Sequence, residues 1–286
     1  MVLVALAACG APRVPREEHA SLSLAADDRM LAIPAGKFVA GSTPEERATA
    51  YDDYLATAHR DVARERHWFD REEDRHVAQL SAFRIDLMPV TQAEYAEYVA
   101  AGRAKPPTMD AATWRAQGFM QDYEVEVRRY VWRDGRPPAG REDHPVVLVA
   151  WAEAAGYCKW RGEQRGEGRR LPTAAEFEKA SRGDNGLAYP WGNTFEPARL
   201  DSAVSGPRDT EAVGNHPEGV SPYGVLGMAG NVFQWTTTPW SEPGTMMVKG
   251  SAWDDFGGVG RGASGHGRAI GARHVIVGFR CAADHR

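Results

Sequence analysis

The residues between 252 and 274 offer the most chemistry in the sequence. Two carboxyl groups, an imidazole and several guanidinium groups lie close together there, and the candidates are Trp253, Asp254, Asp255, Arg261, His266, Arg268 and Arg273. Paired carboxyl groups beside an imidazole can transfer protons, and carboxylate oxygens can bind a hard cation such as Ca²⁺. The same groups can instead form a salt-linked loop that holds irregular backbone. The segment is therefore a candidate for catalysis, for binding, or for a structural role.

Generic catalytic motifs are absent from the sequence. It contains no Walker loop, HExxH, CxxC or GxSxG. Besides Cys9, two cysteines are present, Cys158 and Cys281. In an oxidising compartment these two would form one disulfide. Alternatively, both are reduced, buried thiols that pack as small hydrophobic groups.

Helix-start signals locate the elements that must position these side chains. A Thr followed three residues later by Glu forms a capping box, and the three pairs are Thr43 with Glu46, Thr91 with Glu94, and Thr173 with Glu176. Hydrophobic spacing predicts another helix over 151–161, and short apolar runs predict strands over 30–33, 83–88 and 146–149. From 181 to the end, Gly, Pro and Asn recur every few residues, which predicts mostly irregular backbone.

The first residues are typical of an export signal. Residues 2–8 are apolar and end in small side chains before Cys9, an arrangement that resembles a bacterial lipobox with an acylated cysteine. Residues 10–29 are rich in Pro, Glu and Asp, as expected of a flexible tether. We therefore expect a signal remnant at 1–9 and a chain exported and lipid-anchored through Cys9 to a bacterial membrane, periplasmic or at the cell surface. The alternative is a frayed apolar terminus with an ordinary cysteine.

Charge and hydropathy exclude two classes of protein. The formal net charge is −5, whereas a nucleic-acid binder should carry a basic footprint. The Gly- and Arg-rich stretch 257–273 could be read as an RNA-binding segment, but core-type residues flank it on both sides. No apolar run reaches the roughly 18 residues of a membrane-spanning helix. We therefore expect no nucleic-acid partner and no spanning helix.

Taken in order, several motifs resemble the formylglycine-generating enzyme (sulfatase-modifying factor) domain family over roughly residues 30–283. The motifs occupy residues 33–42, 83–91, 144–151, 157–160, 170–178, 189–192, 223–235, 249–251 and 278–280. The resemblance implies an α+β, loop-rich variant of the C-type lectin fold with little regular secondary structure. It also implies a single domain over 30–286, in which the helical segment 43–75 is an insertion that could cover the site or contact a partner.

The resemblance breaks at the family's catalytic cysteines. The oxidases of the family bind Cu(I) through two thiolates shortly after a Gly-Ser motif, and soft thiolates are the ligands that select Cu(I). After Gly250 and Ser251, the register places Asp254 and Val259 at those two positions. A carboxylate and an isopropyl group cannot hold Cu(I). We therefore expect no copper cofactor and no formylglycine-generating oxidase activity by the known mechanism.

Two further features follow from the resemblance. Family members with cysteines at the positions of Cys158 and Cys281 join them in a disulfide, so the same bond is implied here. The family also binds calcium near a motif that includes Asn231 and position 234 of this chain. Here the family's acid is replaced by Gln234, and losing a negative ligand weakens a calcium site. Calcium is thus the one cofactor that the resemblance leaves open.

The leading functional hypothesis is a non-catalytic member of the family. It would be a secreted or membrane-tethered lipoprotein that binds a protein, peptide or glycan through the loop face 252–274. One alternative is an oxidoreductase-type enzyme with altered site chemistry that matures a protein or a small molecule. Another is a retroelement-diversified, lectin-like receptor, whose variation would lie just before Gly278-Phe279-Arg280. Fold resemblance alone does not decide among them.

Overall fold

The computed structural model describes residues 29–119 and 121–285. The predicted signal remnant at 1–9, with Cys9, lies outside the described residues, and so does the predicted tether except for its last residue. Among the described residues, no helix is long and apolar enough to cross a membrane.

The chain mixes short helices and short strands with long irregular segments. The helices are α2 (Pro44–Ala58), α3 (Val62–Glu65), α4 (Gln92–Ala100), α5 (Ala111–Ala116), α6 (Trp151–Arg165) and α7 (Ala174–Arg182). One-turn helices of other types are η2 (Tyr123–Val127), η3 (Arg128–Tyr130), η4 (Pro197–Arg199) and η5 (Pro217–Gly219). The strands are β1 (Met30–Ile33), β2 (Gly36–Ala40), β3 (His76–Leu80), β4 (Phe83–Asp86), β5 (Arg169–Arg170), β6 (Phe233–Pro239), β7 (Thr245–Lys249), β8 (Gly265–Ala269), β9 (Val277–Gly278) and β10 (Ala282–Asp284).

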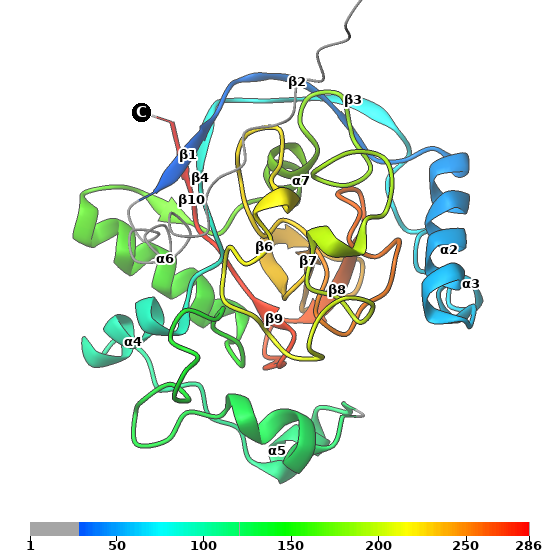
Figure 1. Ribbon diagram of the computed structural model, residues 1–286. Helices are drawn as coiled ribbons and strands as arrows, with labels where there is room; N and C mark the ends of the chain where they lie inside the picture. The colour runs from blue at the N-terminus through cyan, green and yellow to red at the C-terminus, as the bar shows by residue number, and fades with distance from the viewer. Residues whose placement is uncertain (1–28, 120, 286) are drawn as a thin grey trace, which may run out of the picture.

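The strands of the described residues form three small sheets, whose arrangement can be followed in Figure 1. The order is β1-β4-β10-β5 in the first sheet, β2-β3 in the second, and β8-β7-β6-β9 in the third. The β6–β9 pairing is parallel, whereas the other pairings in the third sheet are antiparallel. The first sheet unites the N-terminal strand with the C-terminal one, because β1 and β10 both pair with β4. The third sheet carries the segment that connects β7 to β8, which contains most of the candidate residues.

The three predicted capping boxes are confirmed. In α2, α4 and α7 the Thr side chain accepts from the Glu backbone N–H, and the Glu side chain accepts from the Thr backbone N–H. Such reciprocal bonds satisfy backbone donors that a helix start otherwise leaves unpaired. The helix expected over 151–161 is present and continues to Arg165. Beyond Arg182 the described residues form only short strands and single helical turns between irregular segments, as the spacing of Gly and Pro predicts.

The strand predicted over 146–149 is wrong. These residues are buried, with Val146 and Leu148 fully inaccessible, but they form no strand. Leu148 has a positive φ of 60°, and its backbone N–H donates to the carbonyl of His274 rather than to a strand ladder. The apolar run therefore marks a segment that is buried in the core. A short hydrophobic run does not by itself show whether such a buried segment is a strand.

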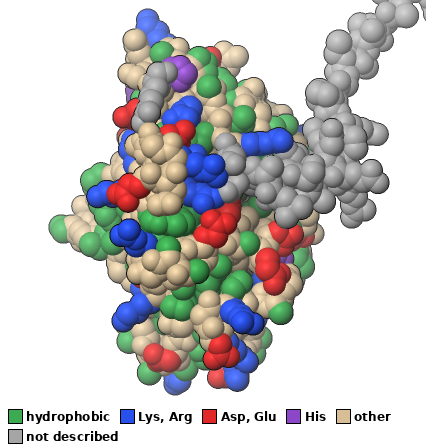
Figure 2. Space-filling view, turned by 90° about the vertical axis from the view of Figure 1, so that its left-hand side faces the viewer, with side chains coloured by type: hydrophobic (Ala, Val, Ile, Leu, Met, Phe, Trp, Pro, Cys, Tyr) green, Lys and Arg blue, Asp and Glu red, His purple; other side chains and the backbone are tan. Residues whose placement is uncertain are grey.

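Aromatic packing and a disulfide stabilise the largely irregular C-terminal part of the chain. Tyr95, Tyr157 and Phe279 pack ring against ring with centroids 5.4–6.2 Å apart. A disulfide joins Cys158 of α6 to Cys281, next to β10, and both residues are buried. This is the bond that the family resemblance implies. Figure 2 shows the face that carries α6, on which acidic and basic side chains are interspersed.

Candidate functional site

A cavity of about 430 Å³ lies beside the segment that connects β7 to β8. Its acidic and imidazole groups come from this connection, from β8 and from the approach to β9, whereas Arg66 and the aromatic walls at Trp68 and Phe119 come from distant parts of the chain. The lining residues are Arg66, Trp68, Gly118, Phe119, Gln121, Phe233, Asp254, Asp255, His266, Arg268, His274 and Ile276. The volume lies within the ~300–1,000 Å³ range of small-molecule pockets.

Backbone hydrogen bonds fix the turn that presents the two carboxyl groups. The backbone N–H of Ala252 donates to Oδ2 of Asp255 at 2.8 Å. The backbone N–H of Trp253 donates to the carbonyl of Asn231 at 3.1 Å, and that of Ala203 donates to the carbonyl of Asp255 at 2.8 Å. Because both sides of the turn are tied to neighbouring loops, the carboxyl groups are held in position before any ligand arrives.

Burial changes the ionisation of the acidic and imidazole groups. It raises the pKa of Asp254 to about 6. Burial, and then the neighbouring carboxylate of Asp254, raise the pKa of Asp255 well above its ordinary value. Burial, assisted by the positive charge of Arg268, lowers the pKa of His266 and that of His274 to about 3. At neutral pH both imidazoles are therefore neutral and Asp254 is mostly ionised, whereas the carboxyl group of Asp255 keeps its proton to a higher pH than an ordinary aspartate does.

Several polar atoms at this site have no hydrogen-bond partner within the described residues. They are Oδ1 of Asp254, Nε2 of His266 and Nε of Arg268, together with Nε1 of the adjacent Trp253. A buried polar group without a partner costs about 1–3 kcal/mol. Unpartnered donors and acceptors that line one cavity are suited to a bound ligand that satisfies them.

Four of the seven residues singled out in the sequence come together here: Asp254, Asp255, His266 and Arg268. Trp253 is buried behind them, with the guanidinium of Arg129 5.5 Å from its ring centre. Arg261 and Arg273 lie in ion pairs elsewhere, with Glu72 and Glu153 respectively. These two arginines hold distant segments of the chain together rather than lining this cavity.

The sequence analysis did not find the aromatic walls of the cavity. The rings of Trp68 and His266 pack in a T-shaped arrangement with centroids 5.9 Å apart, and the ring centroids of Phe119 and His274 are 4.2 Å apart. Trp68 belongs to the segment 43–75, which the sequence analysis predicts to be an insertion, so part of that segment borders the cavity. No motif marks Trp68 or Phe119, because only the tertiary fold brings them to β8 and β9.

The residues that the sequence analysis places at the family's cysteine positions do not fit copper. Asp254 lines the cavity, but Val259 is fully buried in the hydrophobic core and does not reach it. The two cysteines among the described residues are bonded to each other. Since Cu(I) requires soft thiolate or thioether ligands, this donor set cannot replace the family's copper site.

The predicted calcium ligands do not fit a cation either. Oε1 of Gln234 accepts a hydrogen bond from Nε of Arg280 at 2.6 Å, so calcium on that oxygen would face a guanidinium. The side-chain amide of Asn231 is bonded to the backbone of Glu211. The described residues contain no group of three or more His, Cys, Asp and Glu side chains arranged to hold a metal ion.

The sequence analysis missed Asp201. Its buried carboxyl oxygens lack partners among the described residues, and burial raises its pKa to about 8.

Comparisons with known proteins agree with this architecture. The family description "Sulfatase-modifying factor enzyme 1-like domain" matches residues 17–285. The chain is 29% identical over 306 residues to the "Inactive C-alpha-formylglycine-generating enzyme 2" of Mus musculus, covering 92% of this chain and 88% of that protein. It is 34% identical over 213 residues to the "Formylglycine-generating enzyme" of Mycobacterium tuberculosis, covering 60% of this chain and 68% of that protein.

The solved structure of PvdO from Pseudomonas aeruginosa has a similar fold. It superposes with a TM-score of 0.66 at 20% identity, covering 90% of this chain and 94% of PvdO. The predicted α+β, loop-rich variant of the C-type lectin fold is thereby confirmed. From the matched motifs, the shared fold and the extent of the match, we conclude that this chain belongs to the sulfatase-modifying factor enzyme 1-like domain family.

Proposed function

We propose that this protein binds a ligand in the cavity beside Asp254 and does not oxidise a cysteine there. The ligand is a protein, peptide or glycan that presents one group to the cavity and contacts the surrounding loop face 252–274. The observation that carries the proposal is the set of unpartnered polar atoms on Asp254, His266 and Arg268, which line one cavity. Those atoms suit hydrogen bonding to a ligand.

The similarity to a mouse protein whose name describes it as inactive supports the same proposal. The match covers most of both chains. A family member without oxidase activity can therefore retain the whole domain, as this chain does.

We further propose that the protein is exported and tethered to a membrane through Cys9. The support is the apolar run 2–8 that ends in small residues directly before this cysteine. An oxidising compartment is also where the Cys158–Cys281 disulfide would persist.

A binding experiment tests the cavity. The full chain is immobilised, the captured molecule is identified by mass spectrometry, and its affinity is measured by calorimetry. We expect the Asp254→Asn, Asp255→Asn double variant to bind it at least tenfold more weakly, because a charged hydrogen-bond acceptor is lost. The matched control is Asp134→Asn, an exposed position whose φ of 52° Asn tolerates. Equal affinity of the double variant and the control would contradict the proposal.

The pKa of about 6 at Asp254 favours a second candidate, an enzyme with altered chemistry. Carboxyl groups that titrate near neutral pH serve as general acids and bases. The same experiment distinguishes the two functions, because a binding protein returns the captured molecule with its mass unchanged, whereas an enzyme returns a product.

A further inference from the structure

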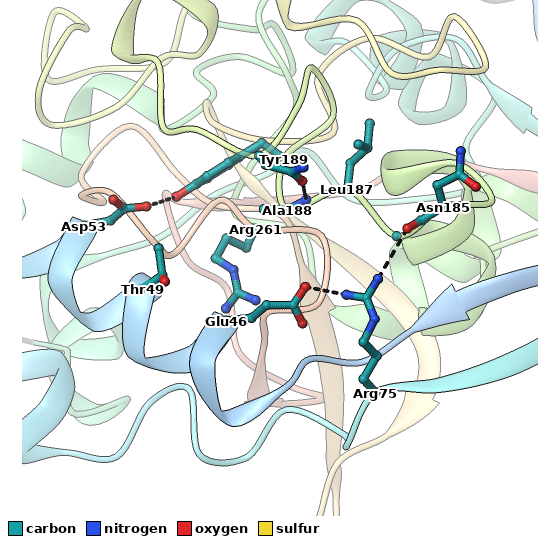
Figure 3. Close-up of a pocket in the computed structure, with 11 residues that line it drawn as sticks. Glu46, Thr49, Asp53, Arg75, Asn185, Leu187, Ala188, Tyr189 and Arg261 are labelled. Atoms are coloured by element: carbon teal, nitrogen blue, oxygen red, sulfur yellow. Dashed lines mark hydrogen bonds and ion pairs between the residues drawn. The ribbon is translucent and has the colours of Figure 1, made fainter.

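A second pocket, of about 390 Å³, lies between helix α2 and the segment 185–193. Figure 3 shows Asp53 and Thr49 extending from α2 toward Tyr189, with the side chain of Arg261 among them. The pocket shares no lining residue with the cavity at Asp254. Its α2 wall belongs to the insertion 43–75.

Arg261 is buried at this pocket with one nitrogen free. Only 2% of the residue is exposed. Its Nη1 donates to both carboxylate oxygens of Glu72, at 3.0 and 3.1 Å, and Glu72 in turn accepts from the hydroxyl of Ser42. Its Nη2 has no partner within the described residues. The guanidinium is therefore fixed in position and presents an unused donor.

Asp53 supplies the complementary acceptor. The hydroxyl of Tyr189 donates to its Oδ2 at 2.9 Å and itself accepts from the backbone N–H of Gly258 at 3.0 Å. This arrangement holds the carboxyl group and leaves Oδ1 available. Burial raises the pKa of Asp53, while Tyr189 and Arg261 lower it. Asp53 and Arg261 influence each other electrostatically but form no ion pair, so each keeps one free atom.

A ligand in this pocket must satisfy both the free donor of Arg261 and the free acceptor of Asp53, and this requirement restricts its chemistry. An oxyanion would bind Arg261 but would be repelled by the carboxylate of Asp53. An ammonium group would bind Asp53 but would be repelled by the guanidinium of Arg261. A hydroxyl group accepts one hydrogen bond and donates another, so it can bridge the two. Asn185 and Asn193 extend this pattern at the rim. Oδ1 of Asn193 accepts from Ala188, which leaves its amide N–H groups free to donate.

We propose that this pocket binds a neutral polyhydroxylated ligand, one sugar unit in size, with a hydroxyl bridging Arg261 and Asp53. The pocket is large enough for such a ligand. Polar side chains surround most of it, so a ligand with hydroxyl groups on every side fits better than a peptide, whose apolar side chains would find few partners.

The test is saturation-transfer NMR on the full chain with glucose, galactose, mannose and N-acetylglucosamine, and with triglycine and sulfate as alternative ligands. We expect at least one sugar to receive saturation, with an affinity that falls at least tenfold in Asp53→Asn. Asn still accepts from Tyr189 but places an amide donor where the acceptor was. The matched control is Asp52→Asn, the exposed neighbour on α2 that pairs with Arg64, and its affinity should not change.

Asn185→Ala provides a second variant at an exposed position where misfolding is not a concern. It should weaken sugar binding several-fold. Sugar binding that is unchanged in Asp53→Asn would overturn the proposal, as would saturation of triglycine or sulfate with none of the sugars. Absence of binding to all four sugars would overturn it too.

Discussion

Glu178→Gln is expected to lower the free energy of unfolding by about 3–5 kcal/mol, the usual cost of removing one partner from a buried ion pair. Glu178 lies on α7 and is 8% exposed. Its Oε1 accepts from the backbone N–H of Gly41 at 2.8 Å and from Nη1 of Arg182 at 2.7 Å. Its Oε2 accepts from Nζ of Lys249 at 3.2 Å. Glutamine keeps the shape but leaves two buried cations without their countercharge.

The pH dependence of this effect has a definite sign. Burial by itself would raise the pKa of Glu178, but Lys249 and Arg182 outweigh it and lower the pKa. A carboxyl group whose pKa is lower in the folded state stabilises the protein above its unfolded pKa, about 4.3, and loses this contribution as pH falls through the folded pKa. The difference between wild type and variant should therefore be full at pH 7 and shrink below about pH 4.

Urea unfolding, monitored by tryptophan fluorescence, tests this prediction. Glu163→Gln is the matched control, because Glu163 is exposed on α6, and surface substitutions usually change stability by less than about 0.5 kcal/mol. A loss below about 1 kcal/mol in Glu178→Gln would contradict the account. The result matters for the site, since Lys249 ends β7 and precedes the segment that presents Asp254.

Removing the disulfide is the second large effect. The bond closes a sequence separation of 123 residues, for which the chain-entropy estimate gives at most about 4–5 kcal/mol, and removing a native disulfide typically costs about 2–5 kcal/mol. We expect the Cys158→Ser, Cys281→Ser double variant to lose stability in this range. The bond lies where the first sheet meets α6, and the backbone N–H of Cys281 also donates to Asp86 at 2.7 Å.

Reductant provides the control for that prediction. Dithiothreitol should destabilise the wild type to the level of the double variant and should leave the double variant unchanged. Alkylation of two free thiols in the unreduced, folded protein would show that the bond is not formed in solution.

Local signals in the sequence predicted the elements that depend on local chemistry. The capping boxes at Thr43, Thr91 and Thr173 mark helix starts because the bonds involved span only three residues. The prediction that Asp254 and Val259 stand at the family's cysteine positions rests on a local signal too, the register that the Gly-Ser motif sets.

Features that depend on tertiary contacts were not predictable. The apolar run 146–149 packs in the core without strand pairing, because its backbone bonds go to residues far away in the chain. Arg261 lies close to Asp254 in the sequence, but its ion-pair partner Glu72 lies 189 residues earlier. In the fold, Arg261 therefore lines a different pocket. Trp68 contacts His266 only because the fold brings the segment 43–75 beside β8. The spacing of residues along the sequence does not show which of them come into contact in the folded chain.

An oxidase assay tests the central claim most directly. The full chain is purified, supplied with Cu(I) and a sulfatase-type cysteine peptide under oxygen, and the peptide mass is recorded, with an active formylglycine-generating enzyme as the positive control. We predict an unchanged peptide, because Asp254 and Val259 provide no thiolate and Cys158 and Cys281 are bonded to each other. Conversion of the cysteine to formylglycine would contradict the account.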